Sequence, residues 1–481
     1  MAYPPGQNIT VRNNGVGLVS TTAALPLVVG HTTGGTPNTL YQYTNPNALR
    51  DEQVSGPALE VALAAIASAG GCLLLVTAAS TAGVASAVDK AAAGSSTGTM
   101  AVSGVPALEL DVRIEITTTG ALGEARFRYT LDGVTFGVVR VIPSGGTFEI
   151  PETGLTLTFT AGAGPVHFEE GDVHTFTTSA PHYTTTDLGG AWTALLAQIG
   201  SRRIRRVVFS GRNATASDGA TMAGAIAGHM ETLEAEHYYA RALCDAGEEA
   251  DPAAVIVAFG AFAHDRVALC YGDARMISRA PFEGYANVRQ PILRAVAERA
   301  FAADLSENLG RKASGALTGV TQIFHDEGTD TAFSEADKIV TLRTFRGQPG
   351  FYITNGYLRS PAGSDFLYWD WGIVVDELCE GVVEGQDKWL LSKLRARTDG
   401  SGNLTDEDAK RVEDAVLSVL NIRLKQPDNI EGFKGHVSGH GYTVDRTNDF
   451  LASRTLISTA NAVPLSPVES IQTTIGLARS I

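Results

Sequence analysis

Glycine-rich segments with hydroxyl side chains are the first places where this sequence suggests chemistry. Residues 30–35, Gly-His-Thr-Thr-Gly-Gly, follow a short apolar run, which is where phosphate-binding loops begin. No Gly-Lys-Ser/Thr closes the segment and no helical pattern starts there, so it fails as a phosphate loop. Residues 94–98, Gly-Ser-Ser-Thr-Gly, match the Gly-x-Ser-x-Gly elbow of hydrolases, which needs a strand before it and a helix after it. An alanine-rich stretch precedes it and an alternating pattern follows, so both segments are better interpreted as flexible loops.

None of the candidate metal-binding or catalytic groups has the residue spacing that its chemistry requires. His229 and Glu236 share a face of one predicted helix, but the His-Glu-x-x-His arrangement of metalloproteases is absent. Residues 399–408 resemble a calcium loop, yet Leu404 stands at the sixth position, where the turn requires glycine. The four cysteines form no Cys-x-x-Cys pair. We therefore expect no catalytic residue, no metal, no cofactor and no enzymatic activity.

A basic run at 202–206, Arg-Arg-Ile-Arg-Arg, stands out in an acidic chain. The favoured interpretation is a helix C-terminus capped by cations just before a strand. The alternative is a patch that docks against an acidic protein surface.

Composition excludes several partner classes. The 481 residues carry 37 Lys and Arg against 52 Asp and Glu, a net charge of −15, which argues against a nucleic-acid partner. The N-terminus lacks a basic region followed by an apolar core, so we expect no secretory signal. The uncharged run 61–88 is interrupted by Gly70-Gly71, which predicts a helix followed by a strand and no membrane insertion.

The elements that must position any site alternate between strand and helix patterns. Residues 21–95 and 181–345 predict an α/β core domain with a mostly parallel sheet covered on both faces. Residues 96–180 lose helical periodicity and predict an inserted all-β domain, a sandwich or barrel of five or more strands, with a hairpin at Asp132-Gly133. Residues 346–467 predict a C-terminal domain, with a strand at 365–371 and a helix at 374–394.

Both ends of the chain have the pattern of extended arms. Residues 1–20 contain the alternating piece Ile9-Thr10-Val11. Residues 468–481 predict a strand whose one face carries Ile471, Thr473, Ile475 and Leu477. A strand so close to a terminus pairs within its own domain or adds to the sheet of a neighbour.

Several segments together resemble the contractile tail sheath family of phages and phage-derived injection machines. The segment 25–35, Leu-Pro-Leu-Val-Val-Gly-His-Thr-Thr-Gly-Gly, resembles the opening of the first sheath domain. Residues 120–133 resemble an insertion of phage sheath and related tail proteins, and residues 350–356, with 363–366 and 374–376, resemble the entry to the C-terminal sheath domain. The ending, Leu-Ala-Arg-Ser-Ile, is similar to the C-terminal arm.

The resemblance implies a multi-domain sheath-like fold whose copies stack as sixfold rings around an inner tube. It implies subunit contacts through Ile9, Val11, Ile471, Thr473, Ile475 and Leu477, and it places the tube-facing surface on the C-terminal domain. Lys393, Arg395 and Arg397 are our candidates for that surface, although a solvated helix end explains them equally well. The implied partners are other copies of the chain, the inner tail tube protein, and baseplate and tail terminator proteins. The implied location is a virion tail assembled in the host cytoplasm.

Two other classes of function stay open. One is a static tail or baseplate protein, although tube subunits are usually much shorter than this chain and lack a separate α/β core. The other is a protein whose α/β core holds a small ligand at the carboxyl ends of its strands, although the sequence indicates no convergent polar residues for such a pocket.

Overall fold

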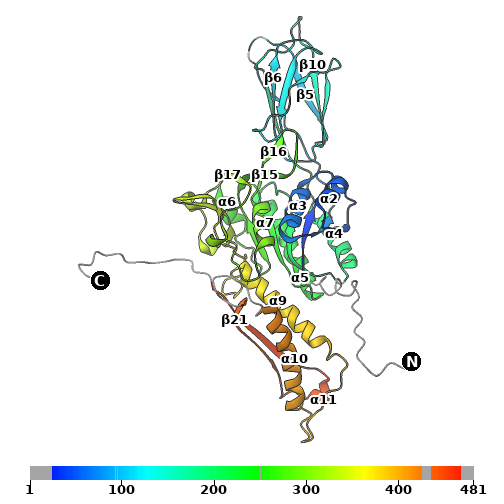
Figure 1. Cartoon of the computed structure of the whole chain (residues 1–481), viewed down its shortest axis with the longest axis vertical. Coiled ribbons are helices and arrows are strands. Elements are labelled where there is room, and N and C mark those ends of the chain that lie inside the picture. Colours follow the sequence, from blue (N-terminus) through cyan, green and yellow to red (C-terminus); the bar gives the residue numbers. More distant parts are fainter. Residues whose placement is uncertain are drawn as a thin grey trace, which may run out of the picture. The chain divides into compact units, whose positions relative to one another are not determined.

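Two units make up the chain in this computed structural model, which describes residues 24–424 and 435–466 except for 93, 95, 201 and 250. Unit 1 comprises Met1–Ala303 and Leu309–Trp369, and unit 2 comprises Asp304–Asn308 and Asp370–Ile481. Mixed α/β structure with several separate sheets is therefore the fold class (Figure 1). Among the described residues, no helix is both long and apolar enough to cross a membrane.

A seven-stranded sheet with the order β18-β14-β13-β12-β1-β3-β2 organises unit 1. Its neighbouring strands are parallel, except that β2 runs antiparallel to β3. Strands β1 and β3 are apolar and, apart from half-buried Leu25, fully buried, as expected for a parallel sheet covered on both faces. The strands are β1 Leu25–Gly30, β2 Thr39–Tyr43, β3 Cys72–Val76, β12 Ile204–Phe209, β13 Arg241–Asp245, β14 Val267–Cys270 and β18 Ile339–Val340.

Helices cover both faces of this sheet. One face packs against α4, α5 and α6, and alternate strand residues such as Leu27, Val29 and Val207 point into that core. The other face packs against α3 and α7. Proline opens α3 and Gly70, in the left-handed region, ends it, as the sequence predicts. The helices of unit 1 are α2 Pro46–Gln53, α3 Pro57–Ala69, α4 Thr185–Gln198, α5 Ala216–Ala235, α6 Pro252–Ala258, α7 Leu293–Ala302 and α8 Glu327–Asp330.

The segment of chain between β3 and α4 forms two antiparallel sheets. One has the order β5-β10-β9 and the other β4-β11-β6-β7-β8, and their inward side chains form one core rich in aromatic residues. We call this segment, residues 89–178, the β module (Figure 1). Its strands are β4 Asp89–Ala91, β5 Thr99–Gly104, β6 Leu110–Thr118, β7 Arg126–Thr130, β8 Arg140–Val141, β9 Thr147–Ile150, β10 Leu155–Thr160 and β11 Val173–Thr178.

The predicted tight hairpin at Asp132-Gly133 is wrong. A longer connection joins β7 to β8, because the Asp132 side chain folds the backbone by accepting hydrogen bonds from the Val134 and Thr135 amides. The carboxylate has a second set of partners on another strand, described below.

Smaller sheets complete unit 1. A hairpin of β15 Asp273–Phe282 and β16 Tyr285–Pro291 turns at Gly284, and β17 Val320–Ile323 pairs with β15. Strands β19 Leu342–Phe345 and β20 Gln348–Ile353 form a second hairpin.

Unit 2 contains two long helices and a two-stranded ribbon. Its elements are α9 Trp369–Asp387, α10 Asp406–Leu424, β21 Val437–Val444, α11 Phe450–Ser453 and β22 Ser458–Pro464. The helices approach closely, since a Cβ on Gly385 would lie 2.8 Å from the Val416 Cα atom.

Two sequence-based predictions fail at the start of unit 2. The expected strand at 365–371 is an irregular segment with one bridge at Tyr368, and the helix starts at Trp369 instead of 374. Trp369, Ile373 and Val374 are buried at helical spacing, so aromatic content alone misled the prediction. The helix also ends at Asp387, before the predicted end at 394, and Leu391 adopts a positive φ of 59° beyond it.

Candidate functional site

The β21–β22 ribbon is an antiparallel pair with one covered face. Val437, Tyr442 and Val444 of β21 are buried against α10, whereas β22 alternates between exposed and half-buried residues along its length. In the part of the chain that the structure describes, neither strand pairs with a third strand. Among the described residues, the outer edges of the ribbon therefore carry backbone groups that no strand pairs with, although the Val444 amide donates to Glu413.

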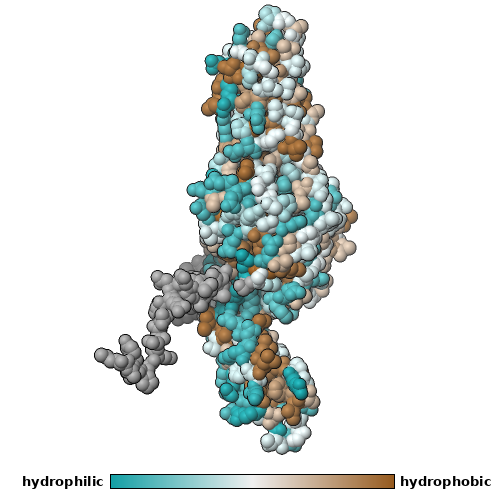
Figure 2. Space-filling view, turned by 90° about the vertical axis from the view of Figure 1, so that its right-hand side faces the viewer, coloured by the Kyte–Doolittle hydropathy of each residue, from teal (hydrophilic) through white to brown (hydrophobic). Residues whose placement is uncertain are grey.

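Exposed apolar side chains accompany the ribbon in unit 2. Leu451 is 68% exposed and Val463 of β22 is 60% exposed. Leu390 and Leu391, in the turn after α9, are 75% and 104% exposed. Figure 2 shows brown patches in its lower part, where unit 2 is drawn. Surfaces of this kind mark protein contacts when they are contiguous.

The predicted arm residues lie outside the described part of the chain. They are Ile9, Val11, Ile471, Thr473, Ile475 and Leu477. Their role stays a prediction.

The three candidate tube-facing cations follow α9 in a non-helical segment, not on a helix end. The Arg395 backbone amide and guanidinium both donate to Asp408, at 2.7 and 2.9 Å, and these bonds lower the pKa of that carboxyl. Arg397 donates to Asp406 at 2.8 Å. Both arginines thus fix the segment to the first turn of α10. Within the described ranges, exposed Lys393 has no ion pair, so it is the cation best placed to meet another molecule.

The basic run caps helices. Arg202 donates to the carbonyls of Gln198 and Ile199 at the end of α4, which confirms the predicted cation at a helix C-terminus. Arg206 donates to the carbonyls of Phe301 and Ala303 at the end of α7.

The hydrolase-like segment 94–98 has no helix after it, and the Lys90 ammonium donates to Ser96 and to the Gly98 carbonyl. Among the described residues there is no group of three or more His, Cys, Asp or Glu that could hold a metal ion.

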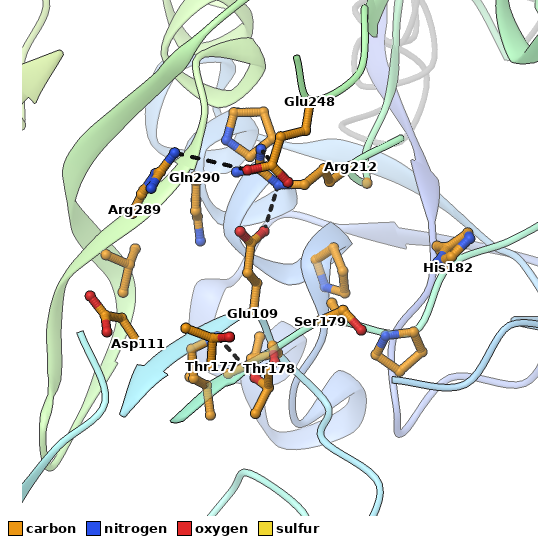
Figure 3. A pocket seen from close by; sticks show the side chains of 18 of the residues that line it. Glu109, Asp111, Thr177, Thr178, Ser179, His182, Arg212, Glu248, Arg289 and Gln290 are labelled. Atoms are coloured by element: carbon orange, nitrogen blue, oxygen red, sulfur yellow. Dashed lines mark hydrogen bonds and ion pairs between the residues drawn. The ribbon is translucent and has the colours of Figure 1, made fainter. Parts of the chain in front are cut away.

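A cavity of about 620 Å³ lies beyond the carboxyl end of β12, beside the first turn of α3 (Figure 3). The chain runs from β1 to β3 on one side and later to β12 on the other, so the strand order reverses here, which is where ligands bind in open α/β sheets. The β module and β16 supply the opposite wall. Much of the lining is apolar and comes from Pro57, Val61, Leu108, Leu110, Leu131 and Leu293.

An ion-pair cluster forms the polar side of the cavity (Figure 3). The Arg212 guanidinium donates to Glu109 of the β module at 2.9 Å and to Asp273 of β15 at 2.8 Å. It also lies 3.8 Å from the Glu248 carboxylate. Arg289 of β16 donates to the second Asp273 oxygen at 2.8 Å and lies 3.9 Å from Glu248. The cluster joins the β module, the parallel sheet and the β15–β16 hairpin.

Negative charge exceeds positive charge in this cluster. Burial raises the pKa of Glu109; Arg212 opposes that rise, whereas Asp273 and Glu248 add to it. Burial also raises the pKa of Asp245, at the end of β13, to about 7, against the effect of Arg212. The Asp245 carboxylate accepts hydrogen bonds from the Asn213 and Gly247 amides, which lie behind the cluster.

Asp132 fastens the β module to β16. One carboxylate oxygen accepts from the Val134 and Thr135 amides, and the other accepts from the Ala286 and Asn287 amides at 3.0 and 2.8 Å. Burial alone would raise the pKa of Asp132, but these four amide donors bring it below its usual range.

Sequence reasoning missed Arg212 and Glu109, which line the cavity, and Asp245, whose charge acts on Arg212. Arg212 and Asp245 follow strands that the sequence predicts, so their place at the carboxyl edge of the sheet was available as a signal. Glu109 carried no such signal, because its contact with Arg212 depends on how the β module docks.

Comparisons with known proteins give structural similarity only. No family model and no curated protein matches the sequence. The chain is similar to a sheath tail protein from Listeria innocua, with 8% identity, 94% of this chain and 98% of that chain covered, and a TM-score of 0.45. It is similar to a chain of the anti-feeding prophage baseplate, with 16% identity, 63% and 76% coverage, and a TM-score of 0.41. A third similar structure is the PVC sheath complex of an extracellular contractile injection system in the contracted state, with 15% identity, 60% and 75% coverage, and a TM-score of 0.42.

Proposed function

We propose that this chain is a structural subunit of a contractile tail sheath. The observation that carries the proposal is the β21–β22 ribbon, which has two strands and two open edges within the described residues. Packing against α10 stabilises the pair on one face, and its edges are where added strands could bind. In this proposal, neighbouring copies of the chain supply those strands.

The two terminal segments have the pattern that such donor strands need. Ile9 and Val11 alternate with polar residues near the N-terminus, and Ile471, Thr473, Ile475 and Leu477 do so near the C-terminus. Each segment would add to the ribbon of a different neighbour, so that backbone hydrogen bonds link every subunit to the lattice. The exposed apolar side chains Leu451 and Val463 support the idea that other chains cover unit 2.

The proposed assembly is a helical sheath of stacked sixfold rings around an inner tail tube protein. It ends at baseplate and tail terminator proteins, belongs to a virion tail, and is built in the host cytoplasm. Lys393 would face an acidic tube, with Arg395 and Arg397 beside it. Contraction would be a change between two packings of the same subunits that drives the tube through the target envelope, with its energy stored at assembly. The chain would act without enzymatic activity or a cofactor, and the β module would face outward.

Electron microscopy of the purified full chain at high concentration tests the proposal. We expect long hollow tubes with a ring repeat, which are lost on deletion of residues 1–18 or 468–481 while circular dichroism shows folded protein. The matched point variants are Ile475→Asp, on the face of the predicted strand that carries Ile471 and Leu477, and Thr474→Asp, on the opposite face. Only Ile475→Asp should abolish tubes.

Normal tubes from either deletion would refute the role of the arms. If the chain alone stays dispersed, co-expression with a tube protein supplies the template, and failure there too would refute the proposal. Tubes of a single diameter, with no shorter and wider state, would favour a static tail component instead.

A further inference from the structure

Unused hydrogen-bond acceptors line the cavity between the β module and the parallel sheet. Oε2 of Glu109 accepts from Arg212, whereas Oε1 has no partner among the residues that the structure describes. Glu248 faces Arg212 and Arg289 at 3.8 and 3.9 Å, distances too long for direct hydrogen bonds. Figure 3 shows Glu109 and Glu248 pointing toward one another on either side of Arg212.

The positive groups beside these acceptors are already engaged. Arg212 donates to Glu109 and Asp273, and Arg289 donates to Asp273. Arg289 also stacks on the Phe324 ring at 4.4 Å. An incoming anion would therefore meet carboxylates rather than free guanidinium groups. An incoming cation would meet the carboxylates of Glu109 and Glu248, which line the cavity beside Arg212 and Arg289, whereas Asp273 and Asp245 do not line it.

The neighbouring carboxylates that oppose ionisation of Glu109 favour a positive charge next to it. Burial raises the pKa of this carboxyl, and Asp273 and Glu248 add to that effect. A cation placed against Glu109 would offset the repulsion from Asp273 and Glu248.

The rest of the cavity suits an apolar body. Leu110, Leu131 and Leu293 line it and are themselves buried, and Val61 and Pro57 of α3 continue the same wall. Its volume of about 620 Å³ falls within the range of small-molecule sites, which pair an apolar lining with a few convergent polar groups.

We propose that this cavity binds a primary organic ammonium with an apolar body, whose nitrogen donates to Glu109 and Glu248 while its carbon skeleton lies against Leu110, Leu131 and Leu293. An ammonium group has three donors, which matches acceptors that the chain leaves unused. Because the β module, the parallel sheet and β16 all line the cavity, such a ligand would also hold these three parts together. The proposal goes beyond assembly and is independent of it.

Three probes of nearly equal size test the assignment: phenethylamine, phenethyl alcohol and phenylacetate, titrated into the full chain by calorimetry at pH 7.5. We expect the amine to bind about tenfold more tightly than the alcohol and the anion not to bind, because only the amine supplies charge-assisted donors. Glu109→Gln should weaken amine binding about tenfold and leave the alcohol unchanged. Glu248→Gln, on a more exposed side chain, should weaken amine binding in the same direction.

Glu115→Gln is the matched control. Glu115 also pairs with an arginine of the β module, Arg128, but it does not line the cavity, so amine binding should stay unchanged. Tighter binding of the anion than of the amine would overturn the proposal. It would also be overturned if Glu109→Gln and Glu248→Gln proteins that fold normally bound the amine as tightly as the unaltered chain does. The absence of amine binding at 10 mM, roughly the weakest affinity expected of such a site, would overturn it as well.

Discussion

Replacing Asp132 with asparagine should loosen the attachment of the β module. The carboxylate is 2% exposed and accepts four backbone amides, two within its own loop and two from β16. Asparagine keeps one carbonyl oxygen and turns an NH₂ group toward two of those donors. Two hydrogen bonds to a charged acceptor are lost, at about 1.5–3 kcal/mol each. Since the variant also avoids the cost of burying a charge, we expect a net loss of about 3 kcal/mol in the free energy of unfolding of unit 1.

The loss should depend on pH in a defined direction. The folded pKa of Asp132 lies below its usual value, so the carboxylate contributes stability above the unfolded pKa of about 3.9 and loses it as pH falls through the folded pKa. The difference between the two proteins should therefore be full at pH 7 and shrink below about pH 4.

Urea unfolding at pH 7 and at pH 3, with hydrogen exchange at the Ala286 and Asn287 amides, measures the effect. Asp89→Asn makes the same chemical change on an exposed strand of the same module, and it should shift stability by less than about 0.5 kcal/mol. If Asp132→Asn matches that control at pH 7, or if its effect is undiminished at pH 3, the reasoning is wrong.

Three further changes test other contacts. Glu60→Gln should lower the free energy of unfolding of unit 1 by about 3–5 kcal/mol in urea, because it removes the counter-charge of the buried Arg294 guanidinium, which lies 2.6 Å from Glu60. A loss under about 1 kcal/mol, the value of an exposed ion pair, would contradict this. Gly385→Val should destabilise unit 2 by about 1–3 kcal/mol in the same assay, because the new side chain would collide with Val416 of α10, and an unchanged transition would show that the helices do not pack this closely. Lys393→Ala should leave unfolding within about 0.5 kcal/mol yet reduce co-sedimentation with an acidic tube protein, and unchanged co-sedimentation would remove Lys393 from the proposed tube-facing surface.

The central part of the fold was predictable because its strands are uninterrupted apolar runs. Segments 25–30 and 72–76 have no polar face, and such runs occur where helices cover both sides of a parallel sheet. Strands β6 and β10 were predictable from a different signal, the alternation of apolar and polar residues, because one face of each strand packs into the core of the β module.

The start of unit 2 was not predictable from local pattern. Aromatic residues at 366–371 favour a strand by propensity, yet burial of Trp369, Ile373 and Val374 at helical spacing determines the outcome. The cavity was hidden for a different reason. Glu109 and Arg212 meet across 103 positions of sequence, and no periodicity within either segment encodes that contact.

The order of strands along the chain affects how this protein can be synthesised. Leu27 of β1 pairs with Val207 of β12, so at the usual ~5–20 residues per second the ribosome needs roughly 10–40 s to make the intervening ~180 residues. During that interval β1 can pair with β3, but its other neighbour, β12, has not been synthesised. The β module, by contrast, is continuous in sequence and has its own core, so it can form on the nascent chain first. A chaperone that shields apolar strands should therefore raise the yield of folded subunit by protecting these two early strands.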